Sequence, residues 1–187
     1  VNFTPPSEPY GFMQINPRSL QIYNNGNIAD LADNRKPVYQ GAGGKNGKSL
    51  YFDGSNNHLT TGRHTPNADG FSVGAWFRTD ASGSAKASLM SWGDSGAQLE
   101  LGIDASGNLA FDASGTNIVT STSDAPEGVY DDEWHMGMVT YDGTTTTTTL
   151  YLNGISSGTP SGASLPAYTT RGMTLAKAHK QDVNKYT

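Results

Sequence analysis

Residues 131–154, DDEWHMGMVTYDGTTTTTTLYLNG, constrain this chain most, because they indicate two extended strands joined by a turn. Side chains in the first arm alternate between two faces, which is the period of a strand. Both faces are largely apolar, so we expect this strand to be covered on both sides. Asp142 and Gly143 supply the backbone conformations of a tight hairpin turn, and the β-branched threonines at 144–149 disfavour a helix. Asn153 and Gly154 indicate a second turn, which predicts a β-meander.

Composition narrows the fold and the partners. At 187 residues the chain is long enough for one domain, and its 23 glycines suit short strands separated by turns. The net charge of -5 and the scattered Lys and Arg residues argue against nucleic acid and an anionic membrane surface. No apolar run approaches the roughly 20 residues that cross a bilayer. The absence of cysteine excludes disulfides and thiol chemistry but leaves the compartment open.

Strand patterns recur along the chain with Gly, Asn, Asp and Ser between them. Residues 1–20 predict an extended lead-in and a first strand, and residues 21–187 a single domain. The clearest strand is FSVGAWFRTD, which places Phe71, Val73 and Phe77 on one face and Trp76 on the other. About ten short strands with at most one helical turn, in NIADLADN, predict an all-β fold, an antiparallel sandwich of two sheets. Besides the two arms of the hairpin at residues 131–154, the expected strand segments are GFMQI, SLQIYNNG, SLYFDG, NNHLTTG, FSVGAWFRTD, SLMSWG, QLELGID, NLAFDAS, TNIVTSTS and GMTLAKA, with GAGGKNG as a loop.

The succession GKSLYFDGSNNHLTTG, FSVGAWFRTD, SLMSWG, DEWHMGMVTYDGTTTTTTLYLNG and GMTLAKA resembles the laminin-G-like, concanavalin A-like jelly-roll superfamily of lectins and glucanases. The resemblance runs from about residue 47 to residue 178 and implies two antiparallel sheets packed face to face. Such domains usually end with a strand that returns beside the first one, and the chain stops at QDVNKYT soon after GMTLAKA. We therefore expect an open sheet edge that a further segment, the N-terminal segment or another subunit closes.

Catalysis is not expected. The hydrolases of that superfamily share an E-x-D-x-x-E strand, in which carboxylates two apart project from the same face, and this chain has no such run. The nearest approach to a carboxylate ladder is Glu100 with Asp104, about 13 Å apart along a strand and therefore too far for a retaining pair. We expect both to lie on a solvated outer face. No nucleophile elbow, zinc-binding helix or phosphate loop is present either.

A sugar-binding site needs an aromatic platform and planar polar groups. The candidate ligand-binding residues are Trp92, Trp76, His58, Arg78 and Tyr51. Trp92 ends a strand next to Gly93, where we expect an exposed ring. Trp76 either lines the binding surface or fills space under a rim loop. The superfamily holds residues similar to Trp134 and His135 at their positions, which indicates a packing role.

Calcium is a further possibility that the resemblance implies. The ion takes six to eight oxygen ligands, which loops rich in Asp and Asn can supply. The candidate metal ligands are Asp53, Asn56 and Asn57 in one loop and Asp142 at the hairpin turn. The same residues are also common in turns that bind no metal. The four histidines show no metal-ligand spacing.

Two functions remain open. The first is a noncatalytic carbohydrate-binding or adhesion module that is extracellular or displayed on a surface, with a glycan or a surface receptor as its partner. The second is a structural or receptor-binding virion component, such as a phage tail-fibre or capsid decoration domain, which associates with a neighbouring subunit at the open sheet edge. A glycoside hydrolase is a third and weaker alternative. The fold alone does not decide among them.

Overall fold

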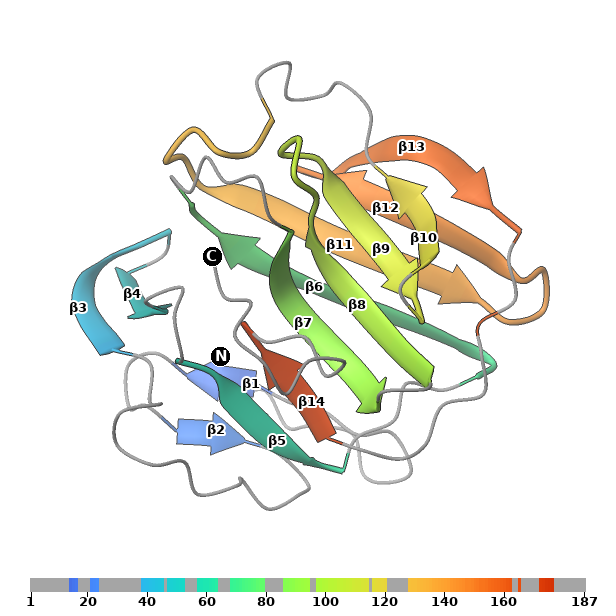
Figure 1. The fold of residues 1–187 in the computed structure, drawn as a ribbon. Helices are drawn as coiled ribbons and strands as arrows, with labels where there is room; N and C mark the ends of the chain where they lie inside the picture. The colour runs from blue at the N-terminus through green and yellow to red at the C-terminus, as the bar shows by residue number, and fades with distance from the viewer. Residues whose placement is uncertain are drawn as a thin grey trace.

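The chain folds into antiparallel strands, and the part that the structure describes contains no helix. The computed structural model describes residues 14–16, 21–23, 38–45, 47–52, 57–63, 68–79, 86–94, 97–114, 116–120, 128–162, 165 and 172–176. Two sheets lie face to face, as Figure 1 shows, so the predicted two-sheet β-sandwich is confirmed. The segment NIADLADN lies outside the described residues. Among the described residues, no helix is long and apolar enough to span a membrane.

The larger sheet has six strands in the order β10-β9-β8-β7-β14-β5. Its strands are β5 (Leu59–Arg63), β7 (Ala87–Asp94), β8 (Ala97–Ile103), β9 (Leu109–Ala113), β10 (Thr116–Thr120) and β14 (Gly172–Leu175). Each pair of neighbours is antiparallel. All six strands fall on segments that the alternation of side chains predicts.

The smaller sheet has four strands in the order β13-β12-β11-β6. Its strands are β6 (Gly70–Phe77), β11 (His135–Asp142), β12 (Thr147–Leu152) and β13 (Ile155–Ser161). The last three form the predicted meander, and β6 pairs with β11 along its whole length.

Two further hairpins lie in the N-terminal part of the chain. β1 (Gln14–Asn16) pairs with β2 (Gln21–Tyr23), as expected for GFMQI and SLQIYNNG. β3 (Val38–Gly44) pairs with β4 (Gly47–Tyr51). The predicted loop GAGGKNG is therefore partly wrong, because residues 41–44 belong to β3, Lys45 lies in the turn and Gly47 begins β4.

The hydrophobic core lies between the two main sheets. In QLELGID, Leu99, Leu101 and Ile103 are buried as predicted, and the inward face of FSVGAWFRTD packs against them. Phe71 of β6 lies beside Phe111 of β9, with ring centroids 6.3 Å apart, so aromatic contact joins the two sheets. The buried members of the core are Phe77, Met90, Trp92, Leu99, Leu101, Ile103, Leu109, Phe111, Ala113, Val119, Val129, Val139, Leu150, Leu152 and Met173.

The two turns of the meander differ. Asn153 and Gly154 have φ angles of 53° and 84° and connect the paired residues Leu152 and Ile155, which is the tight turn expected there. The expected tight turn at 142–143 is wrong, because residues 143–146 form the connection and Asp142 pairs with Thr147. The left-handed residue is Thr146, at φ 54°. Gly143 is needed for a different reason, since a Cβ there would overlap the backbone of residues 68–69.

Candidate functional site

The outer face of the four-stranded sheet is the side of β6, β11 and β12 that points away from the six-stranded sheet. Burial alternates along β11, so the prediction that this strand is covered on both sides is wrong. The six-stranded sheet covers only the side that carries His135, Val139 and Tyr141. The exposed or half-buried side chains of the outer face are Ser72, Trp76, Met136, Met138, Thr140, Asp142, Thr147, Thr149 and Tyr151.

One end of the outer face is apolar. Trp76 of β6 is 45% exposed and pairs across the sheet with Met136. In the next row, Met138 lies between Tyr151 of β12 and Gly74 of β6. A Cβ at Gly74 would come within 2.9 Å of the Met138 Cβ and 3.1 Å of the Met136 Cε, so the glycine leaves room for both methionines. Aromatic and thioether groups thus form a continuous partly exposed patch.

The other end of the outer face is a hollow rich in hydroxyl groups. It has a volume of about 570 Å³ and is lined by Gly70, Phe71, Ser72, Thr140, Tyr141, Asp142, Thr145, Thr147 and Thr149. Thr140 pairs with Ser72 on one side and with Thr149 on the other, so three hydroxyl-bearing residues form a row across the strands. Ser72 and Trp76 are four residues apart on β6, which corresponds to about 13 Å.

Asp142 gives the hollow a negative charge. Its Oδ1 accepts a hydrogen bond from the Thr144 backbone N–H at 2.9 Å, and its Oδ2 accepts one from the Thr145 hydroxyl at 2.7 Å. These hydrogen bonds, that of the Thr145 side chain foremost, lower the pKa of Asp142 because they favour the charged carboxylate. The carboxylate is therefore ionised at neutral pH.

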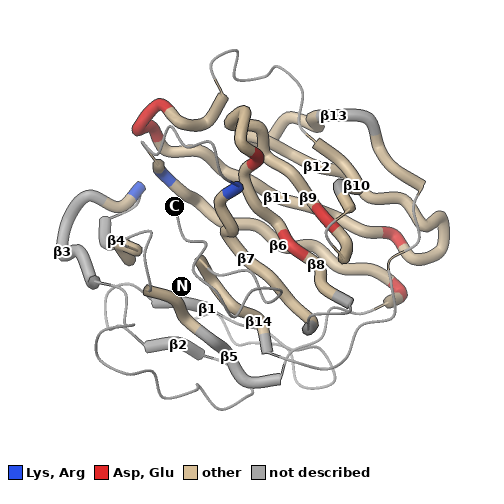
Figure 2. The backbone as a smooth tube through the Cα atoms, viewed as in Figure 1, with Lys and Arg blue, Asp and Glu red and all other residues tan. Residues whose placement is uncertain are grey.

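Cationic groups lie at the apolar end. Lys45 places its Nζ 5.1 Å from the centroid of the Trp76 ring, a cation–π contact. Arg78 follows Trp76 by two residues, and its Nε lies 2.8 Å from the Asp132 Oδ1. Figure 2 shows the blue Lys and Arg segments gathered on the side of the molecule where β6 ends. The Trp76 end of the outer face therefore carries two cations, one of them paired with Asp132, and the hollow carries the Asp142 carboxylate.

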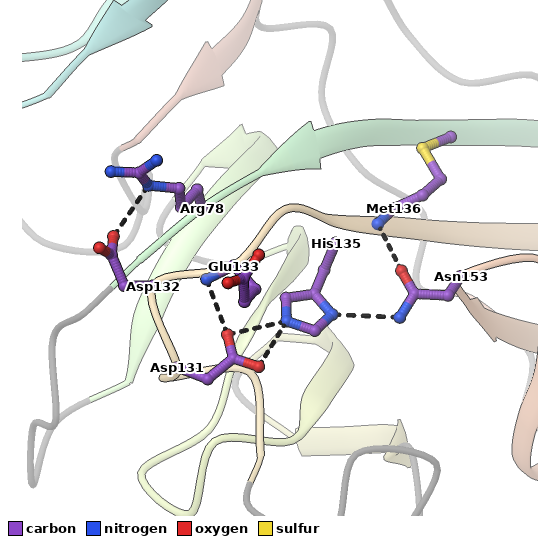
Figure 3. Close-up of polar contacts among 7 residues, drawn as sticks. All are labelled: Arg78, Asp131, Asp132, Glu133, His135, Met136 and Asn153. Carbon is purple, nitrogen blue, oxygen red and sulfur yellow. Dashed lines mark hydrogen bonds and ion pairs between the residues drawn. The ribbon is translucent and has the colours of Figure 1, made fainter. Parts of the chain in front are cut away.

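A row of hydrogen-bonded polar side chains around the buried His135 supports this end of the sheet (Figure 3). The Asn153 Oδ1 accepts a hydrogen bond from the Met136 N–H at 3.0 Å, which turns the amide nitrogen toward the His135 Nδ1, 3.1 Å away. The His135 Nδ1 is then the acceptor, and its Nε2–H donates to the Asp131 carboxylate at 3.0 Å. These hydrogen bonds join the loop before β11 and the β12-β13 turn to one imidazole, which agrees with the packing role expected for His135.

Asp131 makes the hydrogen bonds around His135 sensitive to acid. Burial raises the pKa of Asp131, but hydrogen bonds from His135 and from the Glu133 N–H outweigh it and hold the pKa below its ordinary value. A carboxyl whose folded-state pKa is lowered stabilises the fold above its unfolded pKa of about 3.9 and loses that contribution as the pH falls through the folded value.

We predict that Asp131→Asn lowers the free energy of unfolding at pH 7 and that this difference shrinks as the pH falls below about 4. Urea unfolding of both proteins between pH 7 and pH 3 measures it. Glu133→Gln, which removes a neighbouring exposed carboxylate, is the control and should show no such pH dependence. A difference that stays constant across this range contradicts the prediction.

A second polar cluster lies on the six-stranded sheet, on the side opposite the core. Glu100 of β8 pairs across the strands with Asp112 of β9, and both side chains are buried, with exposures of 9% and 10%. The Lys86 Nζ contacts the Asp112 carboxylate and lies 3.5 Å from the Glu100 Oε2, which also accepts a hydrogen bond from the Gln98 Nε2 at 2.8 Å. The expectation that Glu100 lies on a solvated face is therefore wrong, and its nearest acidic neighbour is Asp112 rather than Asp104.

This carboxylate pair bears on catalysis. A hydrolase needs two carboxyl groups that flank a bound sugar in an open site. Here the Lys86 ammonium occupies the space between the two carboxylates, and both are buried. Lys86 thus pairs with both carboxylates, and their side chains are only 9% and 10% exposed.

The predicted ligand-binding residues do not form one site. Trp76 and Arg78 lie together at the apolar end of the outer face. The expected exposed ring of Trp92 is wrong, because Trp92 pairs with Leu99 on the core face and is only 3% exposed. His58 is buried, and Tyr51 is exposed on β4.

The predicted calcium ligands are only partly described. Asp53 and Asn56 lie outside the described residues. Asn57 is buried, and Asp142 uses both carboxylate oxygens within its own turn. No group of three or more His, Cys, Asp or Glu side chains in the described ranges is arranged to hold a metal ion. Calcium binding at residues 53–57 stays a prediction.

Sequence reasoning missed Lys45, Met136, Met138 and Tyr151 as members of the outer face. A signal for the methionines was present, because β11 is apolar on both faces while a sandwich strand has only one core face. The position of Lys45 over Trp76 has no signal in the sequence, since it depends on where the β3-β4 hairpin lies.

Comparisons with known proteins identify the fold. The profile of a laminin G family, described as the concanavalin A-like lectin/glucanases superfamily, matches residues 53–186. No curated protein sequence is significantly similar to the chain.

Solved structures share the fold at low sequence identity. The binding domain of botulinum neurotoxin DC in complex with rat synaptotagmin II is 13% identical, with a TM-score of 0.55, over 88% of this chain and 43% of that chain. The same toxin's binding domain in complex with SialylT is 15% identical, with a TM-score of 0.51, over 87% and 42%. The binding domain of Paraclostridial Mosquitocidal Protein 1 is 14% identical, with a TM-score of 0.53, over 89% and 46%. The chain thus spans less than half the length of these domains.

Proposed function

The chain belongs to the concanavalin A-like lectin/glucanases superfamily, and on that premise we propose that it is a noncatalytic module that binds a glycan on the outer face of its four-stranded sheet. The observation that carries the proposal is the exposed Trp76 ring on the same face as a hollow lined with hydroxyl groups. A pyranose has an apolar face that stacks on an aromatic ring and hydroxyls that need polar partners. The outer face supplies both within about 13 Å along β6.

The comparisons support a binding role. The similar structures are described as binding domains, and two of them hold a rat synaptotagmin II and a SialylT ligand. Because this chain corresponds to less than half of each, the ligands named there support a binding role for this chain but do not indicate which ligand it binds. The proposed location is extracellular or on a displayed surface, where such a module meets glycans or receptors.

The test is glycan binding by the purified protein and its variants. A glycan array selects the ligand, and calorimetric titration then measures its affinity. Trp76→Ala should weaken binding by at least about tenfold, since truncation of an aromatic anchor commonly costs more than 1.4 kcal/mol. Tyr51→Ala is the matched control, because Tyr51 is an exposed aromatic residue on β4, outside the outer face. Loss of binding in Tyr51→Ala but not in Trp76→Ala places the site elsewhere.

Hydrolysis is tested separately. We expect no release of reducing sugar from the glycans that bind, because Lys86 fills the space between Glu100 and Asp112. Release of sugar that disappears in Glu100→Gln would contradict a noncatalytic function.

The second candidate function is assembly into a larger particle, such as a virion component. It is favoured by the position of β6, an eight-residue strand at the edge of its sheet that pairs with β11 on one side in the described part of the chain. Such edges invite pairing with another chain. Size-exclusion chromatography with light scattering, together with the glycan array, distinguishes the two candidate functions. An assembly component should form a defined oligomer and bind no glycan.

A further inference from the structure

We propose that the ligand is an acidic glycan whose carboxylate or sulfate group binds between Lys45 and Arg78, beside the Trp76 ring. The inference rests on the proposed function and adds the charge of the ligand and its direction along the outer face. It starts from the distribution of cations, because the cationic side chains that the structure describes are Lys45, Arg78 and Lys86. Lys86 is engaged by Glu100 and Asp112, whereas Lys45 lies over the Trp76 ring and Arg78 follows Trp76 by two residues.

Lys45 is available to an anion. Its side chain is exposed, and its Nζ lies 5.1 Å from the centroid of the Trp76 ring. It forms no ion pair with the residues that the structure describes. A sugar that packs against the exposed part of this ring brings an acidic substituent close to the ammonium group. Hydrogen bonds that involve ionised groups are roughly twice as strong as neutral ones.

Arg78 retains donors for the same anion. Its Nε lies 2.8 Å from the Asp132 carboxylate, an exposed pair with side-chain exposures of 46% and 58%. Its terminal nitrogens bind no described residue, and in Figure 3 they lie at the end of the side chain beyond the Nε that faces Asp132. A guanidinium presents several donors in a fixed plane that matches a carboxylate or a sulfate.

The opposite end of the outer face sets the direction of the ligand. Asp142 pairs with Gly70, six residues before Trp76 on β6, or about 20 Å along the strand. A carboxylate there repels an acidic group and accepts hydrogen bonds from sugar hydroxyls. An acidic glycan therefore binds with its charged residue at Trp76 and its neutral residues toward the hydroxyl-lined hollow.

Because the protein has a net negative charge, the preference for acidic ligands depends on local contacts. At -5, the chain as a whole does not attract anions over long distances, so an acidic ligand gains affinity only from groups that it contacts. Preference for acidic glycans should then depend on Lys45 and Arg78 individually rather than on the total number of cations.

The experiment compares three arms of ligands by array and titration: carboxylate-bearing oligosaccharides, sulfated oligosaccharides and their neutral counterparts, including the carboxyl-reduced form of each uronic acid. We expect an acidic oligosaccharide to bind about tenfold more tightly than its neutral form, the amount that one charge-assisted hydrogen bond supplies. Lys45→Met should abolish this preference and leave the affinity for the neutral form unchanged. Lys45→Arg, which keeps the charge, should retain the preference, and Arg78→Gln should reduce it.

The outcomes separate the two proposals. Equal affinity for acidic and neutral forms, both lost in Trp76→Ala, overturns the acidic preference and leaves glycan binding at the outer face in place. A preference that persists in both Lys45→Met and Arg78→Gln also overturns it. Absence of binding to all three arms contradicts glycan binding itself. The relative affinity of the carboxylated and sulfated arms identifies the anionic group.

Discussion

Replacing Phe111 with alanine will lower the free energy of unfolding by about 4 kcal/mol, which is the usual cost of deleting a large buried ring. Phe111 is 0% exposed at the centre of β9 and lies 6.3 Å from the Phe71 ring of the opposite sheet. It pairs with Leu101 on β8 and with Val119 on β10, so its removal opens a cavity that neighbours on both sides border. Because strands fixed on both sides cannot collapse into the space, we expect the cost not to fall below the usual range of about 3 to 5 kcal/mol.

Urea unfolding followed by tryptophan fluorescence measures this loss. Ile155→Ala is the control, because Ile155 is 60% exposed and its truncation should change the free energy by less than about 0.5 kcal/mol. Phe111→Leu keeps most of the volume and should cost less than about 1.5 kcal/mol, which provides a measurement if the alanine variant fails to fold. A loss below about 1.5 kcal/mol in Phe111→Ala contradicts the central position of this ring in the core.

Replacing Lys86 with methionine will cost about 3 kcal/mol, because it leaves two buried carboxylates opposite each other without a cation. Glu100 and Asp112 are direct cross-strand neighbours, and their side chains are 9% and 10% exposed. Like charges at such positions destabilise a sheet even at its surface. Methionine keeps the length and most of the apolar contacts of lysine, so the loss reports on charge.

Arg78→Met is the matched control, since Arg78 also pairs with a carboxylate but both partners are exposed, at 46% and 58%. It should cost less than about 1 kcal/mol. Adding Asp112→Asn to Lys86→Met should recover part of the stability, because a single carboxylate then remains at the pair. Equal costs for the two methionine variants, or no recovery in the double variant, would refute a buried charge network.

Much of the fold was predictable because alternation is a local property. The inward residues of QLELGID and FSVGAWFRTD and the turn at Asn153 follow from residues that are near one another in the sequence. Each depends on the two-residue period of a strand or on a turn of two residues. These features do not require knowledge of which strands are neighbours.

The site was less predictable because it depends on those neighbours. Trp92 and Trp76 are both aromatic residues in strands, yet Trp76 is 45% exposed while Trp92 lies in the core, where it pairs with Leu99 of the neighbouring strand. The prediction of a tight turn at residues 142–143 was wrong because it also depends on neighbouring segments. The Asp-Gly pair favours a tight turn locally, but the backbone of residues 68–69 lies against Gly143, and the connection extends to Thr146.

The sequence by itself determined that the chain forms antiparallel strands and which residues of QLELGID and FSVGAWFRTD face the core, since these properties reside in the spacing of apolar side chains. Tertiary structure alone decided which side chains meet on the strand faces that point away from the core. Register between strands set Glu100 against Asp112 under Lys86, and it placed Met136 beside Trp76 under Lys45. These contacts join residues on separate strands, and hydrogen bonding between backbones, which carries no side-chain pattern, brings them together.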